Sequence, residues 1–166
     1  QLHFNKMMDL LYPLIKPYVH QIQIGLEIDS WEVGMQNWTS GFEGEFCERT
    51  GYDLIKYLPA MTGKIVGSKE MTERFLWDIR RVQADLLADN YYGEFRNLCN
   101  QYGLVSYCEP YDRGPMEELQ IGSRVDGVMG EFWNGLSAIF QNNLMMRRTT
   151  KLASSIAHIN GQKVVG

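Results

Sequence analysis

Carboxylates and aromatic rings gather in three short stretches of this chain, and together they could bind and cleave a sugar. The stretches DSWE, CEPYD and DGVMGEFW contribute the following acidic residues and tryptophans: Asp29, Trp31, Glu32, Glu109, Asp126, Glu131 and Trp133. Aromatic faces stack on the C–H faces of pyranose rings, and carboxylates accept hydrogen bonds from hydroxyls. A pair of carboxylates can also hydrolyse a glycosidic bond, one as acid and the other as base or nucleophile. Because twenty acidic residues place several at strand ends by chance, an unrelated α/β enzyme or a binding module stays open beside a carbohydrate-active enzyme.

Each of these stretches belongs to a segment that predicts a β-strand. Residues 21–29 alternate apolar and polar side chains, so one face of this strand is apolar and carries Ile22, Ile24, Leu26 and Ile28. Further strands are expected within residues 104–112 and 118–133, and a fourth begins near residue 163. The apolar face of the first strand is expected to pack against helices while its carboxyl end opens on a cleft.

Helical patterns separate these strands. Residues 4–16 carry apolar side chains at helical spacing, and Pro13 is expected to kink or split this helix. Ser40 is the expected N-cap of a short helix that ends at Gly51, and residues 52–63 give a further helical piece.

The longest helical stretch follows Ser68, its expected N-cap, with Gly93 as a point of division and Gly103 as its end. We assign its aromatic side chains to packing rather than to ligand contacts: Trp77, Tyr91, Tyr92 and Phe95. A last helix ends before Gly161.

Alternating strands and helices predict an α/β fold with parallel strands and long helices. In parallel α/β architectures the functional residues lie at the carboxyl ends of the strands. The acidic and aromatic residues lie at those predicted ends, so their position favours a binding or catalytic cleft.

Composition excludes several classes of function. The net charge of −4 argues against nucleic acid or an anionic membrane as the main partner. No apolar run approaches a membrane span, and the first residues do not form a signal peptide. Cys47, Cys99 and Cys108 lack metal-ligand spacing, and we expect the last two to be buried thiols. No phosphate-binding motif is present.

The literal residues resemble a known family. The run from residue 26 to 68, LEIDSWEVGMQNWTSGFEGEFCERTGYDLIKYLPAMTGKIVGS, is similar to the catalytic region of glycoside hydrolase family 106, the bacterial α-L-rhamnosidases. The similarity continues through ERFLWDIRRVQADLLADNYYGEFRNLCNQYGL, YCEPYDRGP, DGVMGEFW and KLASSIAHINGQKVVG. It covers nearly the whole chain, and DSWEVG and MGEFW are its most specific parts.

This resemblance implies a (β/α)8 TIM-barrel-type catalytic domain. It implies an enzyme that removes terminal α-L-rhamnosyl residues from plant glycans or glycosides by an inverting mechanism. The two carboxylates of such a mechanism stand roughly 6.5–9.5 Å apart to admit a water molecule. It also implies calcium near the bound sugar, a rhamnose-containing oligosaccharide or glycoside as partner, and a periplasmic or secreted parent protein.

Residue roles follow from the resemblance, and each has a structural alternative. Glu32 is the expected general acid, or else a surface residue. Glu131 is the expected base or a ligand to sugar or calcium, and Glu109 competes for either role. We expect Asp29 and Asp126 to contact hydroxyls or metal, and Trp31 and Trp133 to form sugar-stacking walls or core. Glu27 is expected to point toward the barrel axis, in a buried ion pair or a catalytic role.

Chain length sets the last expectation. A complete (β/α)8 barrel needs about 250 residues, and this chain has 166. We therefore expect residues 1–166 to be one segment of a partial barrel, truncated at both ends, which is weak or inactive alone and self-associates through exposed edges. The alternative is a noncatalytic α/β unit that binds sugar, or an inactive piece that only folds or oligomerises.

Overall fold

A single parallel sheet organises the molecule. The computed structural model describes residues 1–131 and 144–165. Four strands lie in the order in which they occur along the chain: β1 (Gly25–Ile28), β2 (Val105–Cys108), β3 (Gly127–Met129) and β4 (Lys163–Val165). Every neighbouring pair is parallel, with Ile28 opposite Cys108 and Cys108 opposite Val128. The expected α/β fold with parallel strands is confirmed.

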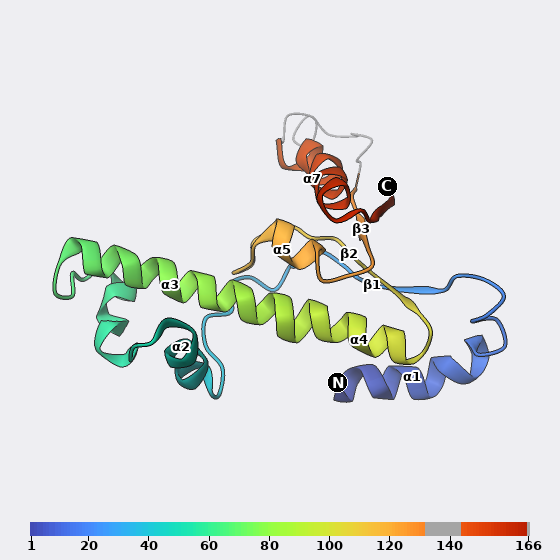
Figure 1. The fold of residues 1–166 in the computed structure, drawn as a ribbon, viewed down its shortest axis with the longest axis horizontal. Helices are drawn as coiled ribbons and strands as arrows, with labels where there is room; N and C mark the ends of the chain where they lie inside the picture. Colours follow the sequence, from blue (N-terminus) through green and yellow to red (C-terminus); the bar gives the residue numbers. More distant parts are fainter. Residues whose placement is uncertain (132–143, 166) are drawn as a thin grey trace.

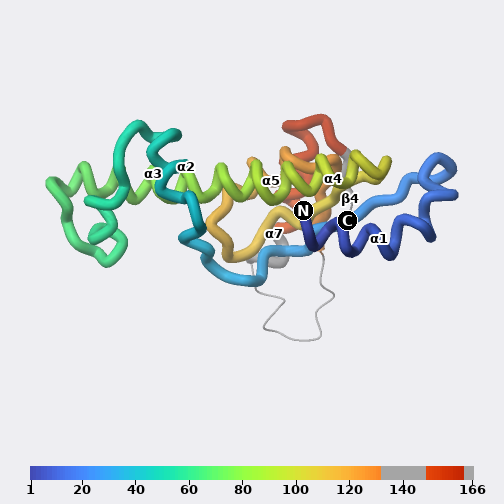
Figure 2. The backbone as a smooth tube through the Cα atoms, turned by 90° about the horizontal axis from the view of Figure 1, so that it is seen from below, coloured from blue at the N-terminus to red at the C-terminus, as the bar shows by residue number. Residues whose placement is uncertain are grey.

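A long helical rod runs beneath the sheet (Figure 1). It comprises α3 (Lys69–Leu87), the π-helical segment η2 (Ala88–Gly93) and α4 (Glu94–Gln101), and it spans most of the molecule's length (Figure 2). The Ser68 hydroxyl accepts a hydrogen bond from the Met71 backbone N–H at 3.1 Å, so the expected cap is confirmed. Gly93 does not divide the rod, because its φ of −65° is helical.

The other helices that the structure describes lie around the rod and the sheet (Figure 1). They are α1 (Leu2–Ile15), α2 (Phe42–Thr50), the 3₁₀ helix η1 (Ile55–Thr62), α5 (Glu118–Gly122) and α7 (Leu144–Asn160). In Figure 1, α2 and α1 lie beneath opposite ends of the rod, and α7 lies above the sheet. Among the described residues, no helix combines the length and the apolar character that a membrane crossing requires.

The two faces of the sheet have opposite character. Side chains of Cys108 and Val128 are buried on one face, and Ile28 packs there too, against η2, α5 and α7. Because side chains alternate along a strand, Glu27, Asp29 and Glu109 belong to the other face. One face thus supplies a hydrophobic core, and the other carries carboxylates.

The first strand is shorter than predicted. The alternating pattern indicated a strand over residues 21–29, but β1 includes only Gly25–Ile28, and Ile22 is exposed in the turn before it. Pairing explains the difference, because the first residue pair between β1 and β2 is Gly25 opposite Val105, and the first hydrogen bond runs from the Val105 N–H to the Ile24 carbonyl.

The predicted N-cap Ser40 is wrong, and Pro13 does not split its helix. Gly41, not Ser40, precedes α2, and its φ of 82° is left-handed, a conformation that favours glycine. Helix α1 continues through Pro13, and it buries Phe4 and Met8 while Leu10 and Leu14 are exposed. The helix thus buries only part of its apolar stripe.

Close approach of β3 to α7 depends on Gly130. A Cβ atom at this position would lie 2.9 Å from Thr150 Cα and 3.0 Å from Thr150 N, both backbone atoms that cannot rotate away. Gly44, inside α2, has no such neighbour within 4 Å.

Gly130→Ala is expected to lower the free energy of unfolding by about 1–3 kcal/mol, because the added methyl group overpacks this contact. Urea unfolding followed by circular dichroism measures the change. Gly44→Ala is the matched control and should be neutral or stabilising by up to about 1 kcal/mol. Equal stability of the two variants would mean that β3 and α7 are not packed this closely.

Candidate functional site

Four carboxyl groups meet on one face of the sheet, near the carboxyl ends of three strands. Asp29 follows β1, Glu109 follows β2 and Glu131 lies two residues after β3, while Glu27 is inside β1. Burial raises the pKa of Glu27, and the charges of Asp29 and Glu131 raise it further. The expected convergence of acidic residues from separate strands is therefore present in the structure.

Glu109 is the most buried of these four, with only 6% of its surface exposed. Burial raises the pKa of Glu109 to about 7, the charges of Asp29 and Glu131 add to the rise, and the nearby Tyr111 hydroxyl opposes part of it. This carboxyl can therefore carry a proton at neutral pH, which a general acid or a hydrogen-bond donor to a sugar requires.

Two buried polar atoms of this site, one of them in the Glu109 carboxyl, lack a well-aligned hydrogen bond. Among the described residues, neither Glu109 Oε2 nor the Tyr111 hydroxyl forms a hydrogen bond of good geometry, although the two groups lie close enough for the Tyr111 hydroxyl to lower the pKa of Glu109. Buried polar groups in native proteins are almost always paired. These two groups are consequently available to a ligand or to water on the acidic face.

Glu131 is positioned by α7 through its backbone. The Thr149 hydroxyl, itself buried, donates to the Glu131 carbonyl at 2.7 Å. Gly130 lets the two backbones approach closely enough for this bond. Glu131 is thus held by the helix that leads to β4.

The loop after β1 is fixed by Trp31. Its indole N–H donates to the Gly34 carbonyl at 2.6 Å, and its backbone N–H donates to the Tyr111 carbonyl at 3.1 Å. Its ring meets the Tyr91 ring edge to face, with centroids 5.9 Å apart. Glu32 follows immediately and is exposed. Trp31 therefore positions the Glu32 loop through contacts within the protein, in addition to any contact with sugar.

Close packing against Trp31 extends to Gly114. A Cβ atom there would lie 2.8 Å from Trp31 Cδ1. Asp112, which forms an isolated parallel bridge with Trp31, has a φ of 98°, unusual for a residue other than glycine. Strained backbone of this kind clusters at ligand and catalytic sites.

The structure does not bring two further predicted residues to this face. Asp126 precedes β3 instead of following it, so it lies at the amino end, where its carboxylate pairs with Arg96 at 2.7 Å and accepts from the Ser106 backbone and hydroxyl. Its placement is therefore a correction to the predicted substrate contact. Trp133 lies outside the described residues.

Neither metal nor thiol chemistry gains support from the described side chains. No group of three or more His, Cys, Asp or Glu among them is placed to hold a metal ion, so no step is assigned to calcium. Cys99 and Cys108 are buried, as expected. Burial raises the pKa of the Cys99 thiol to about 12, which excludes a nucleophilic thiolate at neutral pH.

Tyr91 was predicted to pack, and its ring does pack against Trp31 and Tyr92, but it also lies beside the loop after β1. It is 46% exposed and belongs to η2, where the π-helical turn alters the helical phase. Such turns are frequent at functional sites.

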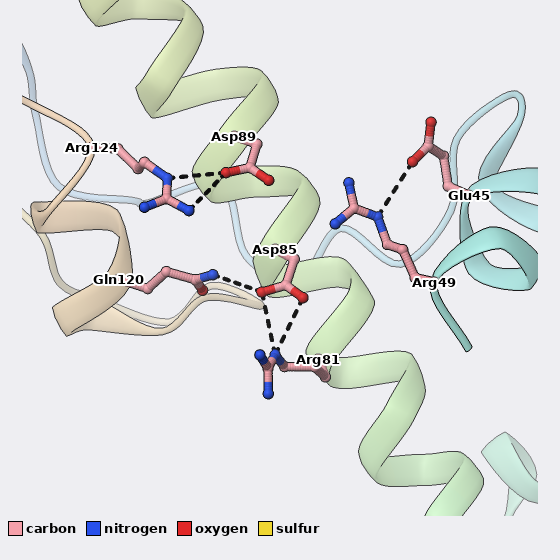
Figure 3. Close-up of polar contacts among 7 residues, drawn as sticks. All are labelled: Glu45, Arg49, Arg81, Asp85, Asp89, Gln120 and Arg124. Atoms are coloured by element: carbon pink, nitrogen blue, oxygen red, sulfur yellow. Dashed lines mark hydrogen bonds and ion pairs between the residues drawn. The ribbon is translucent and has the colours of Figure 1, made fainter. Parts of the chain in front are cut away.

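Polar contacts connect the rod to α5 and to the loop that follows it (Figure 3). Gln120 Nε2 donates to Asp85 at 2.6 Å, and Arg124 pairs with Asp89 at 2.9 Å.

Comparison with known proteins identifies a consistent set of relatives. Residues 3–166 match the model of glycoside hydrolase family 106, described as alpha-L-rhamnosidase. The chain is 50% identical over 139 residues to a protein of Formosa agariphila named "Putative beta-glucuronidase", covering 84% of this chain and 11% of that protein. It superimposes on the rhamnosidase of Novosphingobium sp. PP1Y with a TM-score of 0.77 and 29% identity, over 97% of this chain and 16% of that one. The chain thus spans less than a fifth of either relative.

In the wild-type protein, the ionisation of Glu109 is expected to lower the free energy of unfolding as the pH rises, and Glu109→Gln is expected to remove this effect. The folded protein holds the Glu109 proton up to about pH 7, above the ordinary pKa of 4.5, so between these values it binds more protons than the unfolded chain. The wild-type free energy of unfolding should therefore fall as the pH rises through this window and stay lower above it, by on the order of 2 kcal/mol.

Urea unfolding at about pH 5 and about pH 8 measures this difference. Glu48→Gln, at an exposed position of α2, is the matched control and should keep the wild-type dependence. The same pH dependence in Glu109→Gln and wild type would show that Glu109 is not the group responsible.

Proposed function

Since this chain belongs to glycoside hydrolase family 106, we propose that its parent protein hydrolyses terminal α-L-rhamnosyl linkages with inversion. We further propose that residues 1–166 form part of a (β/α)8 catalytic domain. The sheet supports this, because four parallel strands adjacent in chain order, separated by helices, have the connectivity of a barrel arc.

The observation that carries the proposal is the acidic face. Carboxyl groups from three strand ends meet there, next to a loop whose position is set by Trp31. Glycoside hydrolysis needs one protonated carboxyl and one ionised carboxylate on opposite sides of the scissile bond. The face supplies several carboxyl groups for such chemistry, and burial leaves one of them, Glu109, able to carry a proton near neutral pH and to donate a hydrogen bond to the sugar.

We assign Glu32 as the general acid and Glu131 as the general base. Glu32 is exposed on the loop after β1, directly after Trp31, and a group that protonates a leaving-group oxygen must be accessible to the substrate. Glu131 is anchored through its backbone to α7. Glu109 and Asp29, between them, accept or donate hydrogen bonds to the sugar hydroxyls, with Glu109 as the protonated partner.

The name of the Formosa agariphila relative raises a second candidate, hydrolysis of a β-glucuronide. A glucuronide carries a carboxylate, which the acidic face would repel. None of Glu27, Asp29 and Glu109 forms an ion pair with a Lys or Arg among the described residues, so no such cation offsets their charge. Electrostatics therefore favours a neutral sugar such as L-rhamnose, which has a methyl group where a uronate has its carboxylate.

The test compares the parent protein's activity on aryl α-L-rhamnosides and aryl β-glucuronides. We expect release of rhamnose as the inverted anomer, followed by proton NMR, and no release of glucuronate. Parallel assays with added calcium and with a chelator determine whether the family's expected ion is required. Release of glucuronate alone would replace the rhamnosidase proposal, and release of neither sugar would favour a sugar-binding unit without catalysis.

Glu32→Gln separates the acid from the other carboxyls. A general acid is needed to expel a poor leaving group, whereas 2,4-dinitrophenolate departs without a proton. Glu32→Gln should therefore lower kcat/KM by about 10²–10⁴-fold for methyl α-L-rhamnoside and much less for the dinitrophenyl glycoside.

Glu131→Gln should slow both substrates equally, because water activation is needed in each case. If Glu109→Gln instead showed the leaving-group dependence and Glu32→Gln did not, Glu109 would be the acid.

A further inference from the structure

A second hollow lies beside the acidic face, between the loop after β1 and the helical rod. Its volume is about 470 Å³, within the range of roughly 300–1,000 Å³ typical of ligand pockets. The side chains that define it come from the loop and from α3 and η2: Gln36, Asn37, Trp38, Gln83, Asn90 and Tyr91. Apart from Tyr91, which packs on Trp31, none of these residues has a role in the mechanism proposed above.

The lining has the chemistry of a site for an uncharged sugar. Trp38 is 47% exposed and Tyr91 46% exposed, so each presents part of a ring to the hollow. Amide groups accompany them, and amides both donate to and accept from sugar hydroxyls. Gln83 uses its N–H to bind the Asn37 carbonyl at 3.2 Å, which fixes one wall.

This hollow and the neighbouring one differ in the charge of the residues that line them. Of the described residues that line it, Glu45 alone carries a charge, and Arg49 pairs with that carboxylate at 3.4 Å (Figure 3). The adjoining hollow of about 690 Å³ contains Trp77 together with Arg80 and Arg81. An anionic sugar would therefore fit the hollow with Arg80 and Arg81 better, whereas a neutral sugar fits the hollow with Trp38 and Tyr91.

Position connects the hollow to the site of cleavage. Tyr91 lines this hollow and also the hollow of about 480 Å³ that borders Glu27 and Asp29. The same ring touches Trp31, one residue before the proposed general acid. The loop from Asp29 to Ser40 thus carries acidic residues at its start and the lining of the hollow at its end.

We propose that the hollow between Trp38 and Tyr91 is a subsite for a neutral sugar residue on the leaving-group side of the scissile bond. The assignment of the hollow to the leaving-group side of the bond rests on the proposed glycosidase function. Tyr91 borders both hollows, so the terminal sugar occupies the acidic face on one side of this ring and the next residue of the glycan stacks on Trp38 on the other.

Direct binding to the full-length parent protein tests the subsite without relying on catalysis. The probes are methyl β-D-galactopyranoside and methyl β-D-glucopyranoside, with methyl β-D-glucuronide as their anionic counterpart, followed by saturation-transfer NMR. We expect both neutral glycosides to bind and the glucuronide not to bind. Trp38→Ala should weaken neutral binding about tenfold or more, equivalent to the loss of about 1.4 kcal/mol, and Trp38→Phe should retain most of it.

Trp77→Ala is the matched control, because Trp77 is an exposed tryptophan on the same rod and lines the other hollow. It should bind the neutral probes as wild type does. Thermal unfolding of each variant checks that the fold is intact. Absence of neutral binding in wild type, or equal binding by folded Trp38→Ala, would overturn the subsite. Failure of rhamnoside hydrolysis with these binding results intact would overturn only the proposed function.

Discussion

In-register parallel pairing is the constraint on which the rest of the structure depends. It places Ile28, Cys108 and Val128 side by side, so the residues that follow them emerge at the same edge. Crowding carboxylates there is unfavourable, and each unit of pKa displacement corresponds to about 1.4 kcal/mol. The opposite face offsets this cost, since each fully buried large apolar side chain contributes about 1.5–3 kcal/mol, and Ile121, Val128 and Ile156 are among several there. The hydrophobic core thus holds in place a charged face that would not assemble alone.

Rigid support of the loop after β1 is the second requirement. Trp31 is held through its indole N–H, its backbone N–H and its ring face at once, by Gly34, Tyr111 and Tyr91 respectively. Catalytic groups must be held close to their productive geometry, and packed aromatic residues do this at little conformational cost. A loop that carries acidic residues at one end and ring faces at the other can therefore present both to one extended substrate.

The sequence predicted the class of fold and the meeting of acidic residues because both follow from local rules. Alternation and helix spacing indicated parallel strands, and the rule for carboxyl ends then placed Asp29, Glu109 and Glu131 together. The same rules misplaced Asp126, because a shift of a few residues in the start of β3 moves a side chain from one end of a strand to the other. The protonation of Glu109 could not be predicted, since it depends on burial and on charges contributed by residues distant in sequence. Nor could the π-helical segment that contains Tyr91, because helical periodicity alone does not reveal a change of hydrogen bonding inside the rod.

The π-helical turn lets one rod take part in more than one hydrophobic core. A residue added to a helix rotates everything after it by about 100°, so the buried stripes before and after η2 need not be in phase. Before the turn, Phe75 and Ile79 face the cluster formed with α2 and η1; after it, Leu98 and Cys99 face the cluster formed with α1. Removing one residue from this turn would restore an unbroken α-helix in which only one of the two stripes could keep its partners. The length of this segment is therefore as much a part of the architecture as its composition.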